Sequence, residues 1–281
     1  MQLLRAVLAA FLSQCWACAG DSVPARLTLA TTTSVVNSGL LDTLIPAFKR
    51  ESGIDVRPVP VGSGRALQLL ISGAADVAIT HAPDAEAKTL KDRPGWLYRK
   101  IMFNGFQIVG PPADPAHVKD AATAIDAMQR IAGSGVVFVS RGDSSGTHET
   151  ERRLWALART APPAGKLIAA GSGMGATLKV AASVAAYTLT DDATFAQHAP
   201  QLQQQLAILF EGGPDLLNTY AVIVPSDRTR TAGYAQQFAT WLTTGAGRAA
   251  IDAYTVGPQR QRAFIVWPAD VPRDEPQALP R

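Results

Sequence analysis

The segment from Val136 to Glu151, VVFVSRGDSSGTHETE, combines the features of an anion-binding site. Its β-branched and aromatic residues predict a strand, and a polar loop separates that strand from the helix-forming residues ERRLWALA. The loop offers a guanidinium, three hydroxyls and a residue without a side chain: Arg141, Ser144, Ser145, Thr147 and Gly146. The first N–H groups of the helix lack intrahelical partners and point toward this loop. The segment therefore predicts a site for a small anion.

The same order of strand, polar loop and helix start recurs along the chain. Loops rich in Ser, Thr and Gly begin at Thr31, Gly62, Asp143 and Gly171. Ligands bind at the carboxyl ends of the strands in parallel α/β sheets, so these loops are expected to converge on one cleft. Uncharged donors around one arginine describe a site for a small oxyanion.

The alternation of strand and helix patterns predicts an α/β fold with mostly parallel sheets. One or two strands are expected between Trp96 and Val109, with an interruption at Asn104-Gly105. A polar stretch follows Asp191, and Gln201 to Phe210 is amphipathic or strand-like. The large aromatic residues at helical spacing are interpreted as core: Phe48, Trp155, Phe238 and Trp241.

Length and composition permit a full hydrophobic core. The chain has 281 residues, of which 47% are apolar, so it can form one large or two medium domains. The net charge is +3, and acidic and basic residues are interspersed without a long basic run. We therefore expect no nucleic-acid partner.

The N-terminal residues 1–19 have the pattern of a secretory signal peptide. The segment has a single basic residue, Arg5, and an apolar run from Leu3 to Leu12, and Ala17-Cys18-Ala19 provides a small-residue cleavage site. Both cysteines, Cys15 and Cys18, lie in this segment, so the mature chain is expected to use no thiol chemistry. A lipid anchor on Cys18 is the second-ranked alternative, because Cys15 and Trp16 are poor residues before a lipoprotein cleavage site.

Two enzyme-like motifs have simpler interpretations. Gly142 to Gly146 fits the G-x-S-x-G motif of serine hydrolases, with Ser144 as nucleophile, but a correctly placed acid and histidine are missing. Gly171-x-Gly173-x-x-Ala176, with Asp191 downstream, fits a dinucleotide fingerprint, but repeated βαβ units are missing. We expect neither activity, and no enzyme.

The histidines and Asp143 also have structural interpretations. The histidines show no i, i+4 pair and no carboxylate-rich setting, so we expect no metal site. Asp143 either pairs with Arg141 or caps the following helix, and capping is the favoured interpretation because Asp is common ahead of a helix.

Six motifs in this order resemble those of the tungstate-binding periplasmic components of ABC transporters. They are TTTS at 31–34, GSGRAL at 62–67, THAP at 80–83, SRGDSSGTH at 140–148, GSGMGATL at 171–178 and AYTLTD at 186–191. The resemblance covers the chain from Leu27 to Pro268. It implies the type II periplasmic-binding-protein fold, in which two α/β lobes close on a ligand.

The resemblance also implies how the chain is divided. Residues 25–104 plus 221–268 would form lobe I, and residues 105–220 would form lobe II. The crossovers between the lobes are expected near Asn104 to Phe106 and Asn218 to Tyr220. Residues 269–281, rich in Pro and polar side chains, are expected to be a disordered tail.

The ligand-binding residues that the resemblance implies come from both lobes. A first set of seven binds the oxyanion: Thr32, Thr33, Ser34, Ser63, Arg141, Ser145 and Thr147. A second set contacts the ligand or shapes the pocket and hinge: Gly146, Gly173, Gly175, His81 and Asp191.

His81 separates this chain from the phosphate-binding relatives. Those proteins share R-x-x-x-S-G-T, which is Arg141 to Thr147 here, but carry Ser-Asp-Ala-Pro where this chain has Thr80-His81-Ala82-Pro83. The Asp of the relatives accepts the proton of hydrogen phosphate. A fully deprotonated oxyanion has no proton to donate and would be repelled by a carboxylate, so His81 favours tungstate or molybdate.

The expected function is therefore capture of tungstate in the periplasm, without chemistry or cofactor, for an ABC importer. The expected partners are the anion, a membrane permease and its ATPase, and the protein is expected to be a monomer. Receptors of the same fold for molybdate, sulfate or phosphate remain the alternatives. Molybdate is the nearest of these, because it is nearly equal to tungstate in size and charge.

Overall fold

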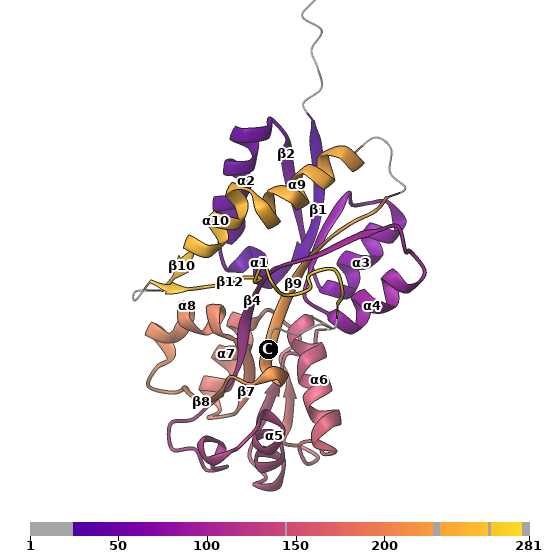
Figure 1. Cartoon of the computed structure of the whole chain (residues 1–281). Coiled ribbons are helices and arrows are strands. Elements are labelled where there is room, and N and C mark those ends of the chain that lie inside the picture. The colour runs from indigo at the N-terminus through magenta and orange to yellow at the C-terminus, as the bar shows by residue number, and fades with distance from the viewer. Residues whose placement is uncertain (1–24, 144, 227–230, 258–259, 277–281) are drawn as a thin grey trace, which may run out of the picture.

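The computed structural model describes residues 25–143, 145–226, 231–257 and 260–276, and it shows two α/β lobes (Figure 1). The strands β4 (Leu97–Gly110) and β9 (Leu217–Val224) run from one lobe into the other and pair antiparallel. The expected two-lobed α/β architecture with two crossovers is confirmed.

The sheet of lobe I is built around β1 (Arg26–Thr32). This strand lies parallel to β2 (Asp55–Val61) on one side and to β3 (Val77–Thr80) on the other. β9 pairs antiparallel with β3, β4 pairs with β9, and β12 (Ile265–Val266) pairs with β4. The helices of this lobe are α1 (Thr33–Asn37), α2 (Leu40–Ser52), α3 (Ser63–Ser72), α4 (Pro83–Lys91), α9 (Ala232–Thr244) and α10 (Ala246–Ala253).

Lobe II contains the second half of β4, which pairs antiparallel with β7 (Thr188–Asp191) and β8 (Ala207–Glu211). β5 (Phe138–Ser140) and β6 (Leu167–Ala169) form a short parallel pair. Its helices are α5 (Ala124–Gly133), α6 (Gly146–Ala158), α7 (Met174–Ser183) and α8 (Asp192–Leu202), with the short 3-10 turns η1 (Val118–Asp120) and η2 (Pro214–Leu216). A small hairpin, β10 (Thr255–Val256) with β11 (Gln261–Arg262), follows α10.

The sequence pattern of α2 explains how the helices attach to the sheets. Leu40, Leu41, Leu44 and Phe48 lie on one face and are buried, as helical spacing requires. Gly53 ends the helix with a φ of 73°, a left-handed conformation in which a side chain would be strained. α2 then packs against α10 from the other end of the chain, and Figure 1 shows the two side by side.

The hydrophobic core divides along β4. Ile101 and Met102 belong to a cluster with Leu27, Phe48 and other residues of lobe I. Phe106 and Ile108 belong to a second cluster, which is formed by helices and strands of lobe II. The buried aromatic residues expected in the core, Phe48, Trp155, Phe238 and Trp241, all lie in these clusters.

Two expectations about the elements are wrong. The sheets are mixed rather than mostly parallel, because the crossover strands β4 and β9 run antiparallel to their neighbours. β4 passes through Asn104-Gly105 without interruption, since β9 supplies pairing partners for both residues. The polar stretch after Asp191, for which the sequence predicted no element, is a helix, α8, and Asp191 caps its N-terminus.

The start of the expected tail is packed against lobe I. The N–H of Lys100 donates to the carbonyl of Arg273 at 2.8 Å, and Arg99 forms an ion pair with Asp274 at 2.7 Å. The expected disorder therefore does not hold for residues 269–276, because Arg99 and Lys100 of β4 bind this segment. Residues 277–281 and the expected signal peptide, with Cys15 and Cys18, lie outside the described residues. Within the described ranges, no helix combines the length and apolar content that crossing a bilayer requires.

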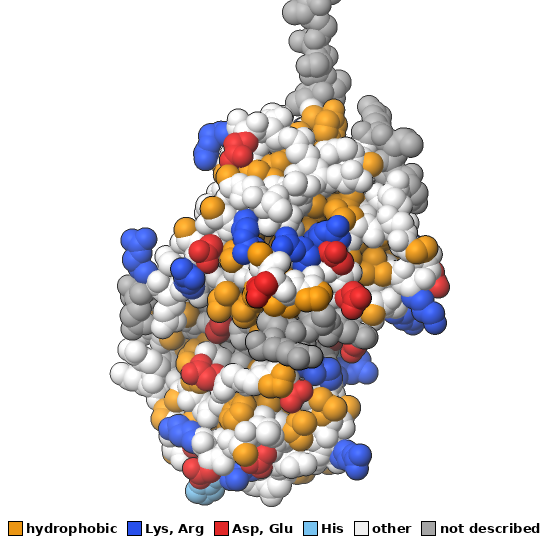
Figure 2. All heavy atoms as spheres, viewed as in Figure 1, with side chains coloured by type: hydrophobic (Ala, Val, Ile, Leu, Met, Phe, Trp, Pro, Cys, Tyr) orange, Lys and Arg blue, Asp and Glu red, His pale blue; other side chains and the backbone are white. Residues whose placement is uncertain are grey.

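Figure 2 shows acidic and basic side chains interspersed over one face of both lobes. This distribution agrees with the sequence, in which neither sign of charge is concentrated. This face therefore shows no extended basic patch of the kind that attracts a polyanion.

Candidate functional site

The lobe I part of the site begins where β1 ends. The hydroxyls of Thr32 and Ser34 lie 2.9 Å apart, and Thr32 also caps α1 by accepting the N–H of Val35 at 3.4 Å. Ser63, the first residue of α3, is fully buried and accepts the N–H of His81 at 3.3 Å. Thr32, Ser34, Ser63 and His81 are thus brought together at the carboxyl ends of β1, β2 and β3.

A buried carboxylate holds the loop that carries His81. Glu86 in α4 accepts the hydroxyl of Thr80 at 2.7 Å and the N–H of Ala82 at 2.9 Å. Its second oxygen accepts the hydroxyl of Tyr98 at 3.0 Å. Burial raises the pKa of Glu86, while these hydrogen bonds oppose that rise. The residues on both sides of His81 are therefore fixed by one side chain.

His81 is buried between the crossover strand β9 and the loop after β1. Its Nδ1 lies 2.8 Å from Oδ1 of Asn218, and its Nε2 lies 3.3 Å from the Ser34 hydroxyl. The ring stacks on Tyr220 with centroids 4.8 Å apart. Burial, followed by the charge of Arg141, lowers the pKa of His81 to about 4, so the imidazole is neutral at pH 7.

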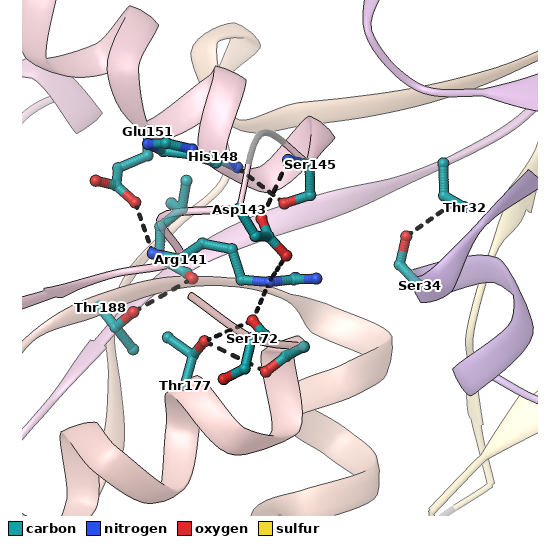
Figure 3. Close-up of polar contacts among 12 residues, drawn as sticks. Thr32, Ser34, Arg141, Asp143, Ser145, His148, Glu151, Ser172, Thr177 and Thr188 are labelled. Atoms are coloured by element: carbon teal, nitrogen blue, oxygen red, sulfur yellow. Dashed lines mark hydrogen bonds and ion pairs between the residues drawn. The ribbon is translucent and has the colours of Figure 1, made fainter. Parts of the chain in front are cut away.

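The lobe II part of the site is organised by Arg141, which follows β5. Nε of Arg141 donates to Asp143 at 2.8 Å and to the carbonyl of Ser172 at 2.7 Å. The N–H of Arg141 donates to Glu151 at 3.1 Å. In Figure 3 the guanidinium points from this anchored position toward Thr32 and Ser34. The side chain is therefore held in place by its Nε edge, with its far end directed toward the other lobe.

The start of α6 completes the lobe II part. Ser145 caps the helix by accepting the N–H of His148 at 3.4 Å, and its own N–H donates to Asp143 at 3.1 Å. Thr147 is buried in the first turn. The favoured interpretation of Asp143 as the helix cap is wrong, because Ser145 takes that position and leaves Asp143 to pair with Arg141.

The two lobes meet at Gly146. A β-carbon on this residue would lie 2.4 Å from Cε1 of His81, so only glycine allows the approach. A small cavity beside this contact is lined by residues of both lobes, including His81, Gly146, Glu149 and Asn218. The lining of this cavity does not include Thr32, Ser34 or Arg141. These side chains face each other across a separate part of the interlobe space, as Figure 3 shows.

Three further residues of the predicted site are not seen in contact with the Arg141 guanidinium or the lobe I hydroxyls. Thr33 is the first residue of α1, beside Thr32. Gly173 is the N-cap residue of α7 and follows Ser172, whose carbonyl holds Arg141. Gly175 faces away into the packing between α7 and α8, because a β-carbon there would lie 2.6 Å from Nε2 of His198. The structure therefore gives Gly175 a packing role.

Asp191 lies at the lobe II side of the crossover with a buried carboxyl. Its Oδ1 accepts the N–H of Thr194 at 2.9 Å, and its Oδ2 has no hydrogen-bond partner among the described residues. Burial raises the pKa of Asp191, and the positive charge of Arg141 partly offsets that rise. This carboxyl is thus within the electrostatic reach of Arg141.

From sequence, the pair of Asp143 with Arg141 was only the less favoured alternative, and the other groups that position the predicted residues were missed. Asp143 and the Ser172 carbonyl hold Arg141, and Asn218 and Tyr220 hold His81. The order Arg-x-Asp in the motif was a signal for the first pairing. Asn218 is far from His81 in the sequence, and no local pattern connects them.

The rival site interpretations gain no geometric support. Ser144 lies outside the described residues, and Nδ1 of His198 is 3.0 Å from the carbonyl of Thr194 in its own helix. Asp191 caps α8 rather than extending toward a nucleotide. In the described part of the chain, no group of His, Cys, Asp and Glu side chains is arranged to hold a metal ion.

Comparisons with known proteins agree with this geometry. A family model described as the PBP superfamily domain matches residues 19–245. Tungstate-binding protein TupA of Peptoclostridium acidaminophilum is 36% identical over 245 residues, which are 85% of this chain and 84% of that protein.

Two solved structures are also similar along most of their length. The tungstate-binding protein TupA from Desulfovibrio alaskensis G20 is 36% identical with a TM-score of 0.74, covering 86% of this chain and 99% of that one. The tungstate ABC transporter protein from Geobacter sulfurreducens is 37% identical with a TM-score of 0.71, covering 82% and 98%.

Proposed function

The chain belongs to the PBP superfamily and to the family of the tungstate-binding proteins, and on this basis we propose that it captures tungstate for an ABC importer. The observation that carries the proposal is the meeting of two polar loops across the crossovers. Hydroxyls from lobe I and a guanidinium from lobe II face one space, and Gly146 contacts His81 at its edge. A tetrahedral oxyanion needs donors from several sides, which two facing loops supply.

The proposed ligand contacts come from seven residues. They are Thr32, Thr33, Ser34 and Ser63 in lobe I, and Arg141, Ser145 and Thr147 in lobe II. The fixed Nε edge of Arg141 leaves the far end of its guanidinium for the anion, as Figure 3 illustrates. Since Asp143 already balances the arginine charge, neutral donors would supply much of the stabilisation of the dianion.

His81 supports an unprotonated anion. A neutral imidazole occupies the place where the phosphate-binding relatives carry a carboxylate, so no fixed negative charge from this loop opposes a dianion. Tungstate carries no proton at neutral pH and requires no carboxylate acceptor. Molybdate shares this property and is the nearest competing ligand.

Closure would follow from the division of the site between lobes. We assign residues 25–104 and 221–268 to lobe I and residues 105–220 to lobe II. An anion that touches both loops binds the closed form better, so it shifts the population toward that form. The closed monomer would then deliver tungstate, outside the cytoplasm, to the permease and its ATPase, without a cofactor.

Calorimetry of Arg141→Ala tests the proposal. We expect tungstate affinity to fall at least about 100-fold, since a charge-assisted contact in a closed site is lost. Arg50→Ala is the matched control, because it removes the same charge from the exposed end of α2. Unchanged tungstate affinity in Arg141→Ala, or equal losses in both variants, would contradict the proposal.

Competition among anions tests the ligand. Tungstate, molybdate, sulfate and phosphate should be titrated in turn against the wild-type protein at constant ionic strength. We expect tungstate to bind most tightly and phosphate to bind weakly, because its proton finds no carboxylate in the 80–83 loop. Preference for phosphate would contradict the role given to His81.

A further inference from the structure

A chain of hydrogen bonds connects α8 of lobe II with both crossovers. Asp192, the first residue of α8, accepts Nδ2 of Asn104 at 2.7 Å and the N–H of Gly105 at 2.9 Å. Oδ1 of Asn104, in β4, accepts Nδ2 of Asn218 in β9 at 2.8 Å. The same Nδ2 donates to the hydroxyl of Tyr220 at 2.8 Å. Asn104 and Asn218 are both nearly fully buried.

The chain continues from β9 into the anion loop of lobe I. Oδ1 of Asn218 lies 2.8 Å from Nδ1 of His81. Nε2 of His81 lies 3.3 Å from the Ser34 hydroxyl, which lies 2.9 Å from that of Thr32. The hydroxyl of Tyr220 also hydrogen-bonds Ser34. We call the series from Asp192 through Asn104, Asn218 and His81 to Ser34 the crossover relay.

The carboxylate of Asp192 fixes the direction of the relay. An ionised carboxylate only accepts, so Asn104 must turn its N–H group toward Asp192 and its carbonyl toward Asn218. Asn218 must then present its N–H group to Asn104, which leaves its carbonyl facing His81. His81 can satisfy that carbonyl only by carrying a proton on Nδ1.

The direction extends to the hydroxyls. A neutral imidazole protonated on Nδ1 has a lone pair on Nε2, so Ser34 donates its proton to His81. The oxygen of Ser34 then accepts from its other hydroxyl neighbours, Thr32 and Tyr220. The Ser34 proton is thereby turned away from the interlobe space.

We propose that Asp192 is a positioning residue that acts through the crossover relay to fix the direction in which Ser34 donates its proton. For anion binding this inference rests on the proposed function. While the relay holds, Ser34 gives no hydroxyl proton to a bound oxyanion, so the contact proposed for Ser34 would be made by its backbone N–H in the first turn of α1. Thr32 can donate its hydroxyl proton only by releasing Ser34. The crossover thus sets the number of hydroxyl donors in lobe I.

Replacing Asp192 by its amide isostere reverses the argument. The N–H of Gly105 requires an oxygen, so Asp192→Asn turns its amide N–H toward Asn104. Asn104 and Asn218 must then each turn over, and an N–H of Asn218 faces His81. The proton of His81 moves to Nε2, which donates to Ser34 and releases the hydroxyl proton of Ser34 toward the anion.

The ¹⁵N NMR signals of the imidazole test this reversal directly. Burial raises the pKa of Asp192 to about 7, so spectra of the anion-free protein should be recorded at pH 8, where the carboxylate is ionised. We expect His81 to carry its proton on Nδ1 in the wild type and on Nε2 in Asp192→Asn. Asp92→Asn, at the exposed end of α4, is the control and should leave the signals unchanged.

An Nε2-protonated His81 in the wild type would overturn the proposal even if no variant folded. An unchanged tautomer in folded Asp192→Asn would overturn it as well. Neither result depends on tungstate binding, so failure of the relay is distinguishable from failure of the proposed function, which the Arg141→Ala titration tests.

Calorimetry with tungstate tests the consequence for affinity. Asp192→Asn should bind about five-fold more tightly, the equivalent of one gained neutral hydrogen bond. Because this variant also removes a negative charge, the double variant Asp192→Asn/Asn218→Leu removes the same charge while breaking the relay. We expect the double variant to bind more weakly than Asp192→Asn, and equal affinities would overturn the relay's control of Ser34.

Discussion

Single residues in this site act through the neighbours that orient them. Arg141 supplies the positive charge, but Asp143 and the Ser172 carbonyl decide where the guanidinium points. His81 likewise depends on Asn218 and Tyr220 for its orientation. The functional unit is therefore each anion-facing residue together with the group that fixes it.

The close approach at Gly146 can be tested by adding one methyl group. Gly146→Ala places a β-carbon against the His81 ring, so the lobes can meet only after one of them shifts. We expect calorimetry to show at least about a ten-fold loss of tungstate affinity. Gly133→Ala at the end of α5 has open space around it and is the control; a loss in both variants would contradict the contact.

Burial of His81 predicts a pH dependence of stability. The pKa of His81 is lowered from 6.5 to about 4, so between these values the unfolded chain binds a proton that the folded protein does not. Stability is therefore lost as pH falls through this window. By pH 5 the loss from this group is about 2 kcal/mol relative to pH 7.

Urea unfolding at pH 7 and pH 5 measures this loss. The comparison requires His81→Gln, because Asp192, with its pKa raised to about 7, changes stability in the opposite direction over an overlapping range. The pH-dependent loss should be smaller in His81→Gln than in the wild type and unchanged in the exposed-residue control His117→Gln. Equal pH dependence in all three proteins would contradict the burial of a neutral His81.

Much of the lobe I and lobe II loops could be predicted from sequence, because their Ser, Thr, Gly and Arg residues lie in compact local motifs. The structure places Thr32, Ser34 and Ser63 around His81, and Arg141 opposite them. Asp143 was assigned to the wrong partner because two nearby groups, an arginine and a helix start, compete for one carboxylate. Asn218 required the fold, since only strand pairing brings β9 beside the 80–83 loop.

At the scale of elements, strand-to-helix junctions position the site and buried polar contacts fix their loops. β1, β3 and β5 each end at a segment that carries site residues. Hydrophobic periodicity identified most of these elements, but it carries no information about strand direction. The antiparallel crossovers β4 and β9 therefore appeared only in the structure.

The loop between β3 and α4 provides a test at this scale. Glu86→Ala leaves the hydroxyls of Thr80 and Tyr98 and the N–H of Ala82 without their buried acceptor. We expect a loss of about 3 kcal/mol or more in the free energy of unfolding, measured with urea. Asp92→Asn, at the exposed end of the same helix, should change it by less than about 0.5 kcal/mol.

Tungstate affinity of the same variants separates folding from loop position. At a temperature where Glu86→Ala remains folded, the 80–83 loop should still be misplaced and binding weakened. Wild-type affinity in folded Glu86→Ala would contradict the assignment of this carboxylate to the loop.

At the scale of the whole molecule, the two lobes have largely separate cores. The hydrophobic clusters of lobe I and lobe II divide along β4, except that Ala193 of α8 joins the lobe I cluster. Rotation about the crossovers would therefore disturb the lobe I core where α8 packs on it. The sequence indicated the two-lobed architecture through motifs spread along the whole chain. It did not reveal that residues 269–276 return to β4, because composition cannot register a contact made through backbone groups.

Small-angle X-ray scattering tests closure. If tungstate binds between the lobes and favours the closed form, its addition should reduce the population-averaged radius of gyration of an open receptor. Arg141→Ala should show no such reduction at the same tungstate concentration. If tungstate reduced the radius of gyration of Arg141→Ala as much as that of the wild type, closure would not depend on binding at this site, and the account would be contradicted.

The most direct test of the account is the tungsten position in a crystal grown with tungstate. Anomalous scattering should give one strong peak between the hydroxyl loop that carries Thr32 and Ser34 and the guanidinium of Arg141. A tungsten peak elsewhere on the molecule, with this space filled by water, would contradict the central claim that the two facing loops form the tungstate site.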